Sequence, residues 1–151
     1  MQLKVRPMQS DDIDNVYAIE LAGHRSPWSR DILRDCVLVN YDCRVIEVVT
    51  SVGVTLAGYI ICRYVETVCH ILNLCIKPAL QGKGYGQFLL KHVIDTQKNT
   101  PVDTIILEVR PSNLVAIHVY QKMGFQQTGI KPGYYQDVNI IEDAVVLQKK
   151  L

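Results

Sequence analysis

The stretch NLCIKPALQGKGYGQFLL, residues 73–90, changes its character twice. It begins with apolar residues typical of a strand, passes Pro78 into a glycine-rich segment, and then places Phe88 and Leu89 in a helical pattern. The chain that leads into the glycine-rich segment, residues 43–76, is rich in β-branched and aromatic residues. The stretch therefore predicts the point where a run of strands gives way to a strand, a loop and a helix.

The glycines of this stretch, Gly82, Gly84 and Gly86, fall at the predicted start of the helix. Because glycine has no Cβ atom, the backbone there can approach a ligand closely and adopt a positive φ. The free N–H groups at a helix N-terminus also favour an anion. The pattern indicates a pyrophosphate site, and the alternative is a glycine-rich turn without a ligand.

Two other phosphate motifs do not fit. A Walker loop has serine or threonine after its lysine, whereas Lys83 is followed by Gly84. The dinucleotide fingerprint follows the first strand of a parallel unit, and this loop comes after several strands.

The remaining sequence predicts a single mixed α+β domain over residues 1–151, since no repeat, low-complexity segment or linker interrupts it. We expect a mostly antiparallel sheet of about seven strands with helices on both faces. The predicted elements are a strand at 3–6, a helix capped by Ser10, a short helix capped by Ser29, three antiparallel strands within 43–76, a helix ending near 96, a strand at 104–109, a helix at 113–123, and strands near 125–131 and 140–149.

Composition excludes several classes of protein. The net charge is +1 and no block of like charges occurs, which argues against direct nucleic-acid binding. No apolar run has the length of a membrane span, and no signal peptide is visible at the N-terminus. The 5 cysteines lack Cys-x-x-Cys spacing, and neither they nor the histidines show metal-ligand spacing. We expect a cytoplasmic protein with buried, reduced thiols and no metal.

The loop resembles the acetyl-CoA motif of the GNAT superfamily, Gln/Arg-x-x-Gly-x-Gly/Ala, at Gln81, Gly84 and Gly86. The resemblance implies a GNAT fold with acetyl-CoA as cosubstrate. It assigns the pyrophosphate to Gly82, Lys83, Gly84, Tyr85, Gly86 and Gln87. It assigns the pantetheine arm to Leu74, Cys75, Ile76 and Asn113.

The segment from Leu107 to Asn113, with Tyr120 and Phe125 beyond it, is similar to the RimI-type ribosomal-protein alanine N-acetyltransferases. The resemblance implies that Glu108 is the general base and Tyr120 the general acid. Residues near the acceptor would be Trp28, Tyr134, Tyr135 and Glu142. From the residues alone, Glu108 could instead be solvated or paired with Arg110, and Tyr120 could be a core tyrosine.

The implied reaction transfers acetyl to the N-terminal α-amine of a protein, an alanine of a small-subunit ribosomal protein, by direct attack in a ternary complex. Deprotonating an α-amine at pH 7 costs about 1 kcal/mol, against about 4.6 kcal/mol for a lysine, so an α-amine needs only a modest base. The alternatives are a lysine or small-molecule amine as acceptor, or a non-catalytic acyl-CoA-binding module. Binding alone would need neither Glu108 nor Tyr120.

Overall fold

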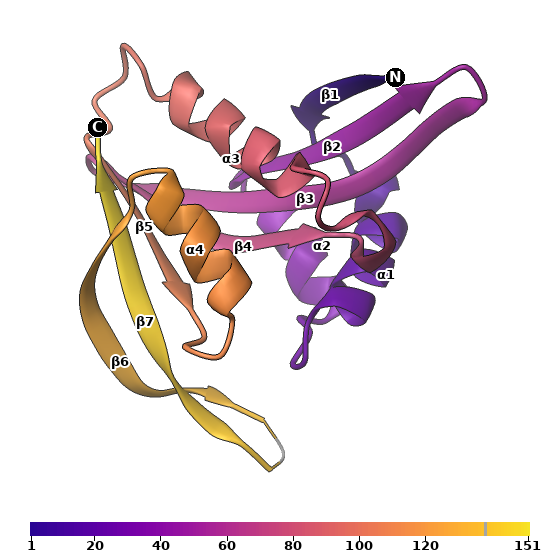
Figure 1. Ribbon diagram of the computed structural model, residues 1–151. Helices are drawn as coiled ribbons and strands as arrows, with labels where there is room; N and C mark the ends of the chain where they lie inside the picture. Colours follow the sequence, from indigo (N-terminus) through magenta and orange to yellow (C-terminus); the bar gives the residue numbers. More distant parts are fainter. Residues whose placement is uncertain (138) are drawn as a thin grey trace. The chain divides into compact units, whose positions relative to one another are not determined.

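The computed structural model describes residues 1–137 and 139–151 (Figure 1). Seven strands form one mixed, mostly antiparallel sheet in the order β1-β2-β3-β4-β5-β7-β6, which confirms the predicted α+β fold class. The elements are β1 (Gln2–Pro7), η1 (Ser10–Asp12), α1 (Ile13–Gly23), α2 (Arg30–Leu38), β2 (Asp42–Thr50), β3 (Gly53–Val65), β4 (Val68–Ile76), η2 (Pro78–Leu80), α3 (Tyr85–Thr96), β5 (Thr104–Val109), α4 (Leu114–Lys122), β6 (Gln126–Gln136) and β7 (Ile141–Lys150).

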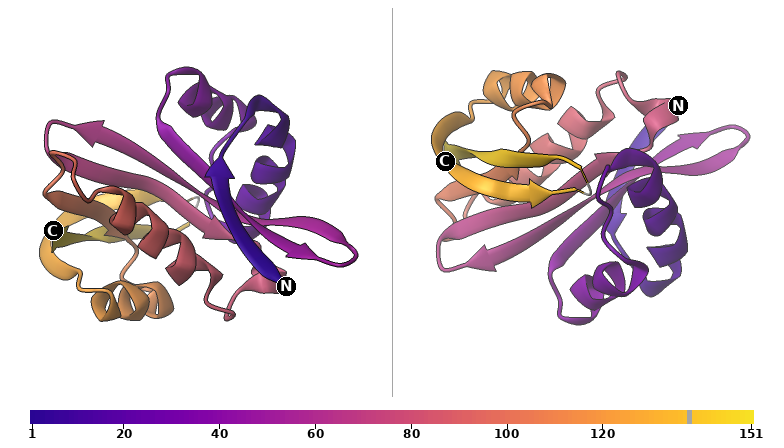
Figure 2. Two further views of the ribbon diagram at one scale, coloured as in Figure 1. Left: turned by 90° about the horizontal axis from the view of Figure 1, so that it is seen from above. Right: turned by 90° about the horizontal axis from the view of Figure 1, so that it is seen from below.

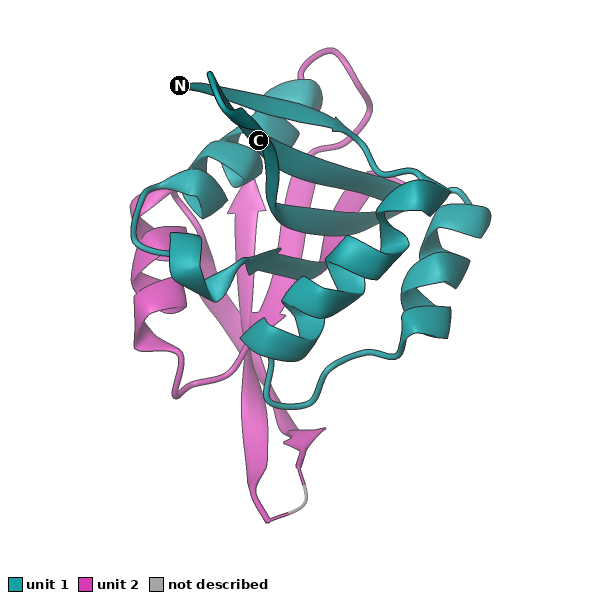
Figure 3. Ribbon diagram, turned by 90° about the vertical axis from the view of Figure 1, so that its right-hand side faces the viewer, with its two compact units in different colours: residues 1–63, 73–96 teal, residues 64–72, 97–151 magenta. Residues whose placement is uncertain are grey.

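The chain forms two compact units (Figure 3). Unit 1 comprises residues 1–63 and 73–96, and unit 2 comprises residues 64–72 and 97–151. Strand β4 contributes its first half to unit 2 and its second half to unit 1. The single domain expected from the sequence stays a prediction.

Unit 1 has helices on both faces of its strands. Strand β2 pairs antiparallel with β1 and with β3. Helices α1 and α2 lie on one face and α3 on the other (Figure 2). Residues 57–62 of β3 are all buried, because this strand is covered on both faces. Helix α2 begins where expected, since the Ser29 hydroxyl accepts the Ile32 N–H at 3.2 Å.

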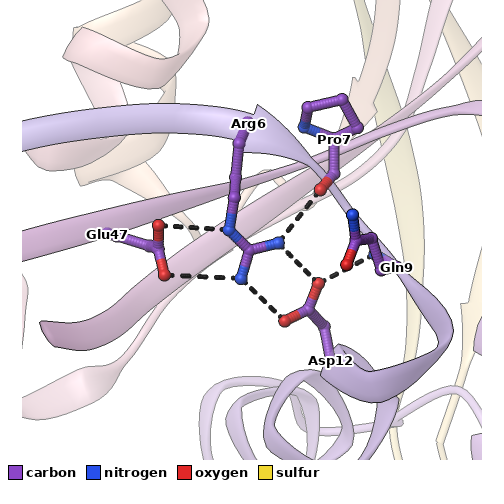
Figure 4. A network of polar contacts seen from close by, with 5 residues as sticks. All are labelled: Arg6, Pro7, Gln9, Asp12 and Glu47. Atoms are coloured by element: carbon purple, nitrogen blue, oxygen red, sulfur yellow. Dashed lines mark hydrogen bonds and ion pairs between the residues drawn. The ribbon is translucent and has the colours of Figure 1, made fainter.

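The predicted cap of the first helix is wrong. Ser10 is the first residue of a short 3-10 helix that precedes α1, and Gln9 is its cap. The Asp12 carboxylate accepts the Gln9 N–H at 2.8 Å and binds the Arg6 guanidinium through two hydrogen bonds of 2.8 Å (Figure 4). Arg6 also contacts Glu47 of β2 at 3.1 Å, so this network ties β1, η1 and β2 together.

In unit 2, the first half of β4 runs parallel to β5, with His70 opposite Ile106. Strand β7 then pairs antiparallel with β5 and β6, and α4 covers one face of these strands (Figures 1 and 2). Strand β6 continues to Gln136 instead of ending near residue 131. Its register shifts between Lys131 and Tyr135, and Gly133 there has φ +59°, so pairing with β7 resumes beyond the irregularity.

All five cysteines are buried and none forms a disulfide, which confirms the prediction of buried thiols. Within residues 1–137 and 139–151, none of the helices has the length and apolar character that a membrane span requires.

Candidate active site

The glycine loop of unit 1 leads directly into α3, as the sequence predicts. Gly82 and Gly84 have φ values of +79° and +83°, and a Cβ atom at either position would meet nothing within 4 Å. The Phe88 N–H bonds to the Gly84 carbonyl at 3.0 Å, so the N–H groups of residues 85–87 precede this first helical hydrogen bond. The loop therefore combines open space, a positive-φ backbone and a helix N-terminus, which suit an anionic group.

The second half of β4 lies beside this loop in the chain and is tied to it. The Gln81 side chain donates a hydrogen bond to the Ile76 carbonyl at 3.1 Å. Gly86 packs close to the same residue, because a Cβ on it would lie 3.4 Å from the Ile76 side chain. Residues 74–76 and 82–87, which the sequence assigns to acetyl-CoA, thus belong to one connected part of unit 1.

Cys75 is the residue of this strand segment whose side chain could act as a nucleophile. The side chain is buried, with 5% of its surface exposed. Burial, helped by the charge of Glu20, raises the pKa of the Cys75 thiol to about 12. The thiol is therefore protonated at neutral pH and is a poor nucleophile.

A buried carboxylate holds the backbone at Trp28, a predicted acceptor-side residue. Glu20 is 1% exposed and accepts hydrogen bonds from the Trp28 N–H at 2.8 Å and from the Asn73 amide at 2.9 Å. It also accepts one from the Tyr59 hydroxyl, whose pKa is raised by burial and by the charge of Glu20. Sequence reasoning missed this network, although Glu20 falls on the apolar stripe of α1, four residues after Val16.

Unit 2 surrounds Glu108 with donors. Its side chain is 6% exposed, and the His70 Nε2 atom lies 2.8 Å and 3.0 Å from the two carboxylate oxygens. The Tyr134 hydroxyl donates to Oε1 at 3.4 Å, and the Lys131 ammonium lies 3.5 Å from Oε2. Burial alone raises the pKa of Glu108, but the hydrogen bond and charge of His70 and the charge of Lys131 outweigh it and lower the pKa.

Arg110 does not pair with Glu108, so that alternative is wrong. Its guanidinium binds Asp137 at 3.1 Å and Glu142 at 3.3 Å, and it lies 4.2 Å from the centre of the Tyr135 ring. Two predicted acceptor-side residues, Tyr135 and Glu142, therefore meet around Arg110. The Ser112 hydroxyl also donates to Glu142 at 3.0 Å, and these contacts lower the pKa of Glu142.

Tyr120 projects from α4 and packs edge-on against Phe125, with ring centres 5.7 Å apart. Burial raises the pKa of its phenol to about 12. Among the described residues, no hydrogen-bond partner of this hydroxyl is present. Asn113 caps the same helix, its side chain accepting the Ala116 N–H at 3.2 Å.

Tyr135 interacts electrostatically with both residues of the predicted catalytic pair. Burial raises the pKa of Tyr135, and the side chains of Tyr134, Glu108 and Tyr120 raise it further. Unit 2 thus brings together Glu108, Tyr120 and three predicted acceptor-side residues, while unit 1 holds Trp28 and the acetyl-CoA loop. Sequence reasoning missed His70, and the alternating pattern of β4 with a polar residue next to Cys69 was the available signal.

The donor groups of the loop match the cosubstrate that the sequence implies. Acetyl-CoA carries a pyrophosphate, and the glycine loop offers N–H groups and space for one. Among residues 1–137 and 139–151, no group of three or more histidine, cysteine or carboxylate side chains is arranged to hold a metal.

Comparison with known proteins shows the family. Residues 12–125 match the model of the acetyltransferase (GNAT) family. A Bacillus subtilis protein named provisionally as a ribosomal protein bS18-alanine N-acetyltransferase is 36% identical over 95% of this chain and 92% of its own length. The Escherichia coli ribosomal protein bS18-alanine N-acetyltransferase is 29% identical over 95% of this chain and 94% of its own length.

Solved structures give the same result. The crystal structure of the ribosomal-protein-S18-alanine N-acetyltransferase from Escherichia coli has a TM-score of 0.88 and 29% identity, and the match covers 99% of this chain and 94% of that one. An Ard1 structure from Thermoplasma volcanium has a TM-score of 0.86 at 22% identity, covering 100% and 99% of the two chains, and shares the fold. The chain therefore belongs to the acetyltransferase (GNAT) family and is an acetyl-CoA-dependent N-acetyltransferase related to the ribosomal bS18-alanine enzymes.

Proposed function

We propose that this enzyme acetylates the N-terminal α-amine of a protein, and that its substrate is the N-terminal alanine of the small-subunit ribosomal protein bS18. The observation that carries the proposal is similarity along nearly the whole chain to relatives named for this reaction, at 36% and 29% identity. An acceptor on the ribosome also implies that the enzyme works in the cytoplasm.

In this proposal residues 82–87 bind the pyrophosphate of acetyl-CoA, and residues 74–76 with Asn113 bind its pantetheine arm. The bound cosubstrate supplies the thioester that the amine attacks. Glu108 drives the removal of the proton from the amine, either as the base itself or through a group that it orients. Tyr120 donates a proton to the departing thiolate, and its pKa of about 12 keeps that proton in place until it is needed.

The acceptor side would be formed by Trp28, Tyr134, Tyr135 and Glu142. Two features support this assignment: Tyr134 donates a hydrogen bond to Glu108, and the Trp28 backbone is fixed by a buried carboxylate. Groups whose position is fixed before binding can orient a peptide with little loss of entropy on binding.

The test is mass spectrometry of peptides incubated with acetyl-CoA and the purified protein. One peptide carries the free N-terminal alanine of bS18, a second has the same sequence with a blocked N-terminus and an added internal lysine, and spermidine serves as a small amine. We expect acetylation of the free α-amine peptide at a rate at least tenfold above the other two. Transfer confined to the lysine or to spermidine would overturn the proposed acceptor while leaving the enzyme class intact.

A further inference from the structure

The proposed base, Glu108, lies in surroundings that work against its acting alone. Its carboxylate has three donors around it, His70, Lys131 and Tyr134, and its pKa is lowered. A carboxylate with a lowered pKa is poorly matched to an amine, because proton transfer is most efficient when the base titrates near the working pH. The geometry around the carboxylate offers a second group that can take the proton, the imidazole of His70.

His70 has one ring nitrogen fixed and the other free. Its Nε2 atom lies 2.8 Å and 3.0 Å from the two oxygens of Glu108. Because an ionised carboxylate only accepts hydrogen bonds, Nε2 must carry the proton in this contact. The lone pair of the neutral ring is then on Nδ1, and among the described residues none hydrogen-bonds to that atom.

The pair is also built to hold this orientation. His70 and Glu108 stand on the neighbouring parallel strands β4 and β5, and His70 lies opposite Ile106, two residues before Glu108. Their side chains are 19% and 6% exposed, so the carboxylate is the more enclosed partner and the imidazole has access to solvent. The pairing of an orienting carboxylate with an imidazole base also occurs in acid–base catalysis by other enzymes, where the two ring nitrogens have the opposite roles.

We propose that Glu108 acts through His70: the carboxylate orients the imidazole, and Nδ1 of His70 removes the proton from the acceptor amine. The inference rests on the proposed transfer to an amine. In this step the N–H bond of the substrate ammonium breaks, an N–H bond forms at Nδ1, and the amine keeps the electron pair with which it attacks. Glu108 stays ionised and stabilises the imidazolium, which then releases its proton to solvent. Lys131, Tyr134 and Tyr135, the other charged or titratable groups that interact with the pair among the described residues, all come from β6.

The pH dependence of the wild-type enzyme distinguishes this arrangement from a carboxylate acting alone. With acetyl-CoA saturating, log(kcat/KM) for the peptide is level with pH while the base is unprotonated and the substrate is an ammonium, and it falls with a slope of about 1 as the base becomes protonated. Imidazoles titrate near neutrality and carboxyl groups lower. We expect this fall to begin above the pH range in which carboxyl groups titrate, and a level profile from pH 7 down to pH 5 would overturn the proposal.

Two variants provide a second test of the role of His70. His70→Gln keeps an N–H donor toward Glu108 but has no base, so we expect kcat/KM at pH 7 to fall about 100-fold and the acid fall of the pH profile to vanish. His118→Gln, an exposed position on α4, is the matched control and should keep its activity. Unchanged activity of His70→Gln would mean that Glu108 needs no imidazole, and the proposal would then be wrong.

A readout independent of turnover covers the case in which His70→Gln does not fold. Nitrogen-15 NMR of labelled histidines reports which ring nitrogen carries the proton. We expect the His70 signals of the wild-type protein to show protonated Nε2 and unprotonated Nδ1 at high pH, and a protonated Nδ1 there would overturn the inference. A wild-type enzyme without any amine acetylation would instead defeat the proposed function, so the two failures are distinguishable.

Discussion

The two residues of the predicted catalytic pair, Glu108 and Tyr120, stand in opposite electrostatic surroundings. His70 and Lys131 favour the ionised form of Glu108, whereas burial favours the neutral form of Tyr120 and raises its pKa to about 12. Opposite shifts within one site are typical of groups that divide the acid and base roles between them. At the level of single residues, the site is therefore prepared to accept one proton and to donate another.

Removing the phenol hydroxyl should affect turnover more than stability. Tyr120→Phe keeps the ring packed against Phe125 and removes a hydroxyl without a hydrogen-bond partner among the described residues. We expect kcat to fall about tenfold or more, the usual contribution of a positioned proton donor, with little change in melting temperature. Steady-state kinetics measure this, with Tyr17→Phe on α1 as control. Full activity of Tyr120→Phe would remove Tyr120 from the mechanism.

Cys75 should be dispensable for the chemistry. Its thiol has a pKa of about 12 and is buried, so a covalent acetyl-cysteine step is disfavoured. We expect Cys75→Ala to keep most of its kcat and to lose some stability through the smaller side chain. Turnover and the intact mass of the enzyme mixed with acetyl-CoA are the measurements. An acetyl adduct on Cys75 that passes to the peptide would contradict direct transfer.

At the scale of the elements, the glycine loop is suited to binding a ligand and the network around Arg6 to stabilising the fold. The loop keeps positive φ values in open space, which leaves room for a ligand to approach the backbone. The Arg6 network ties β1, η1 and β2 together through a guanidinium shared by two carboxylates (Figure 4). We therefore expect the loop to govern ligand affinity and the network to govern stability.

A side chain at Gly84 should weaken cosubstrate binding. Gly84 has φ +83°, where valine is strained by about 1–3 kcal/mol, so the loop would shift its N–H groups. We expect Gly84→Val to raise the Kd for acetyl-CoA about tenfold or more in calorimetry. Gly53→Val is the matched control, because Gly53 has φ +144° in equally open space at the β2–β3 turn. Unchanged affinity in Gly84→Val would argue against the loop as the binding site.

The Asp12 carboxylate should contribute to stability only above acid pH. The Arg6 guanidinium lowers the pKa of Asp12 below its ordinary value of 3.8. Its contribution is then complete above about pH 4 and is lost as the pH falls through the lowered pKa. We expect Asp12→Asn to lower the free energy of unfolding by about 1–3 kcal/mol at pH 7, with a smaller difference at pH 3.

Denaturant titration at the two pH values measures this dependence. Asp11→Asn is the control, because Asp11 is the exposed neighbour of Asp12 and should change stability little. A destabilisation by Asp12→Asn that stays the same at both pH values would mean that the charge on Asp12 has no part in it.

For the molecule as a whole, the burial of all five cysteine thiols, none of which is in a disulfide, should limit their reaction with thiol reagents. Burial raises the pKa of the Cys43 and Cys75 thiols to about 12 each, so little thiolate is present at neutral pH. We expect fewer than one thiol per chain to react rapidly with a disulfide reagent in the native state, and all 5 in guanidinium chloride. Absorbance of the released thiolate gives both values, and rapid native reaction of several thiols would contradict the burial.

Much of the fold follows from local sequence. The strand at 104–109, the helix starting at Tyr85 and the Ser29 cap lie where the pattern predicts them, because periodicity, capping and glycine spacing depend on neighbours in the chain. Family resemblance added the GNAT fold and the enzyme class, which the comparisons confirm. The predicted end of the strand near residue 131 was wrong, because β6 is extended by pairing with β7.

The partners of the charged side chains were decided by the tertiary structure alone. His70 and Glu108 are 38 residues apart, and they meet only because β4 and β5 lie side by side in one register. The same holds for Glu20, whose partner Asn73 is 53 residues away, and for Arg110, which binds Glu142 rather than the nearer Glu108. The sequence by itself determined where strands, helices and the glycine loop form and to which family the chain belongs. Only the packing of distant strands determined which donors surround each carboxylate, and a buried carboxylate takes its pKa from those donors.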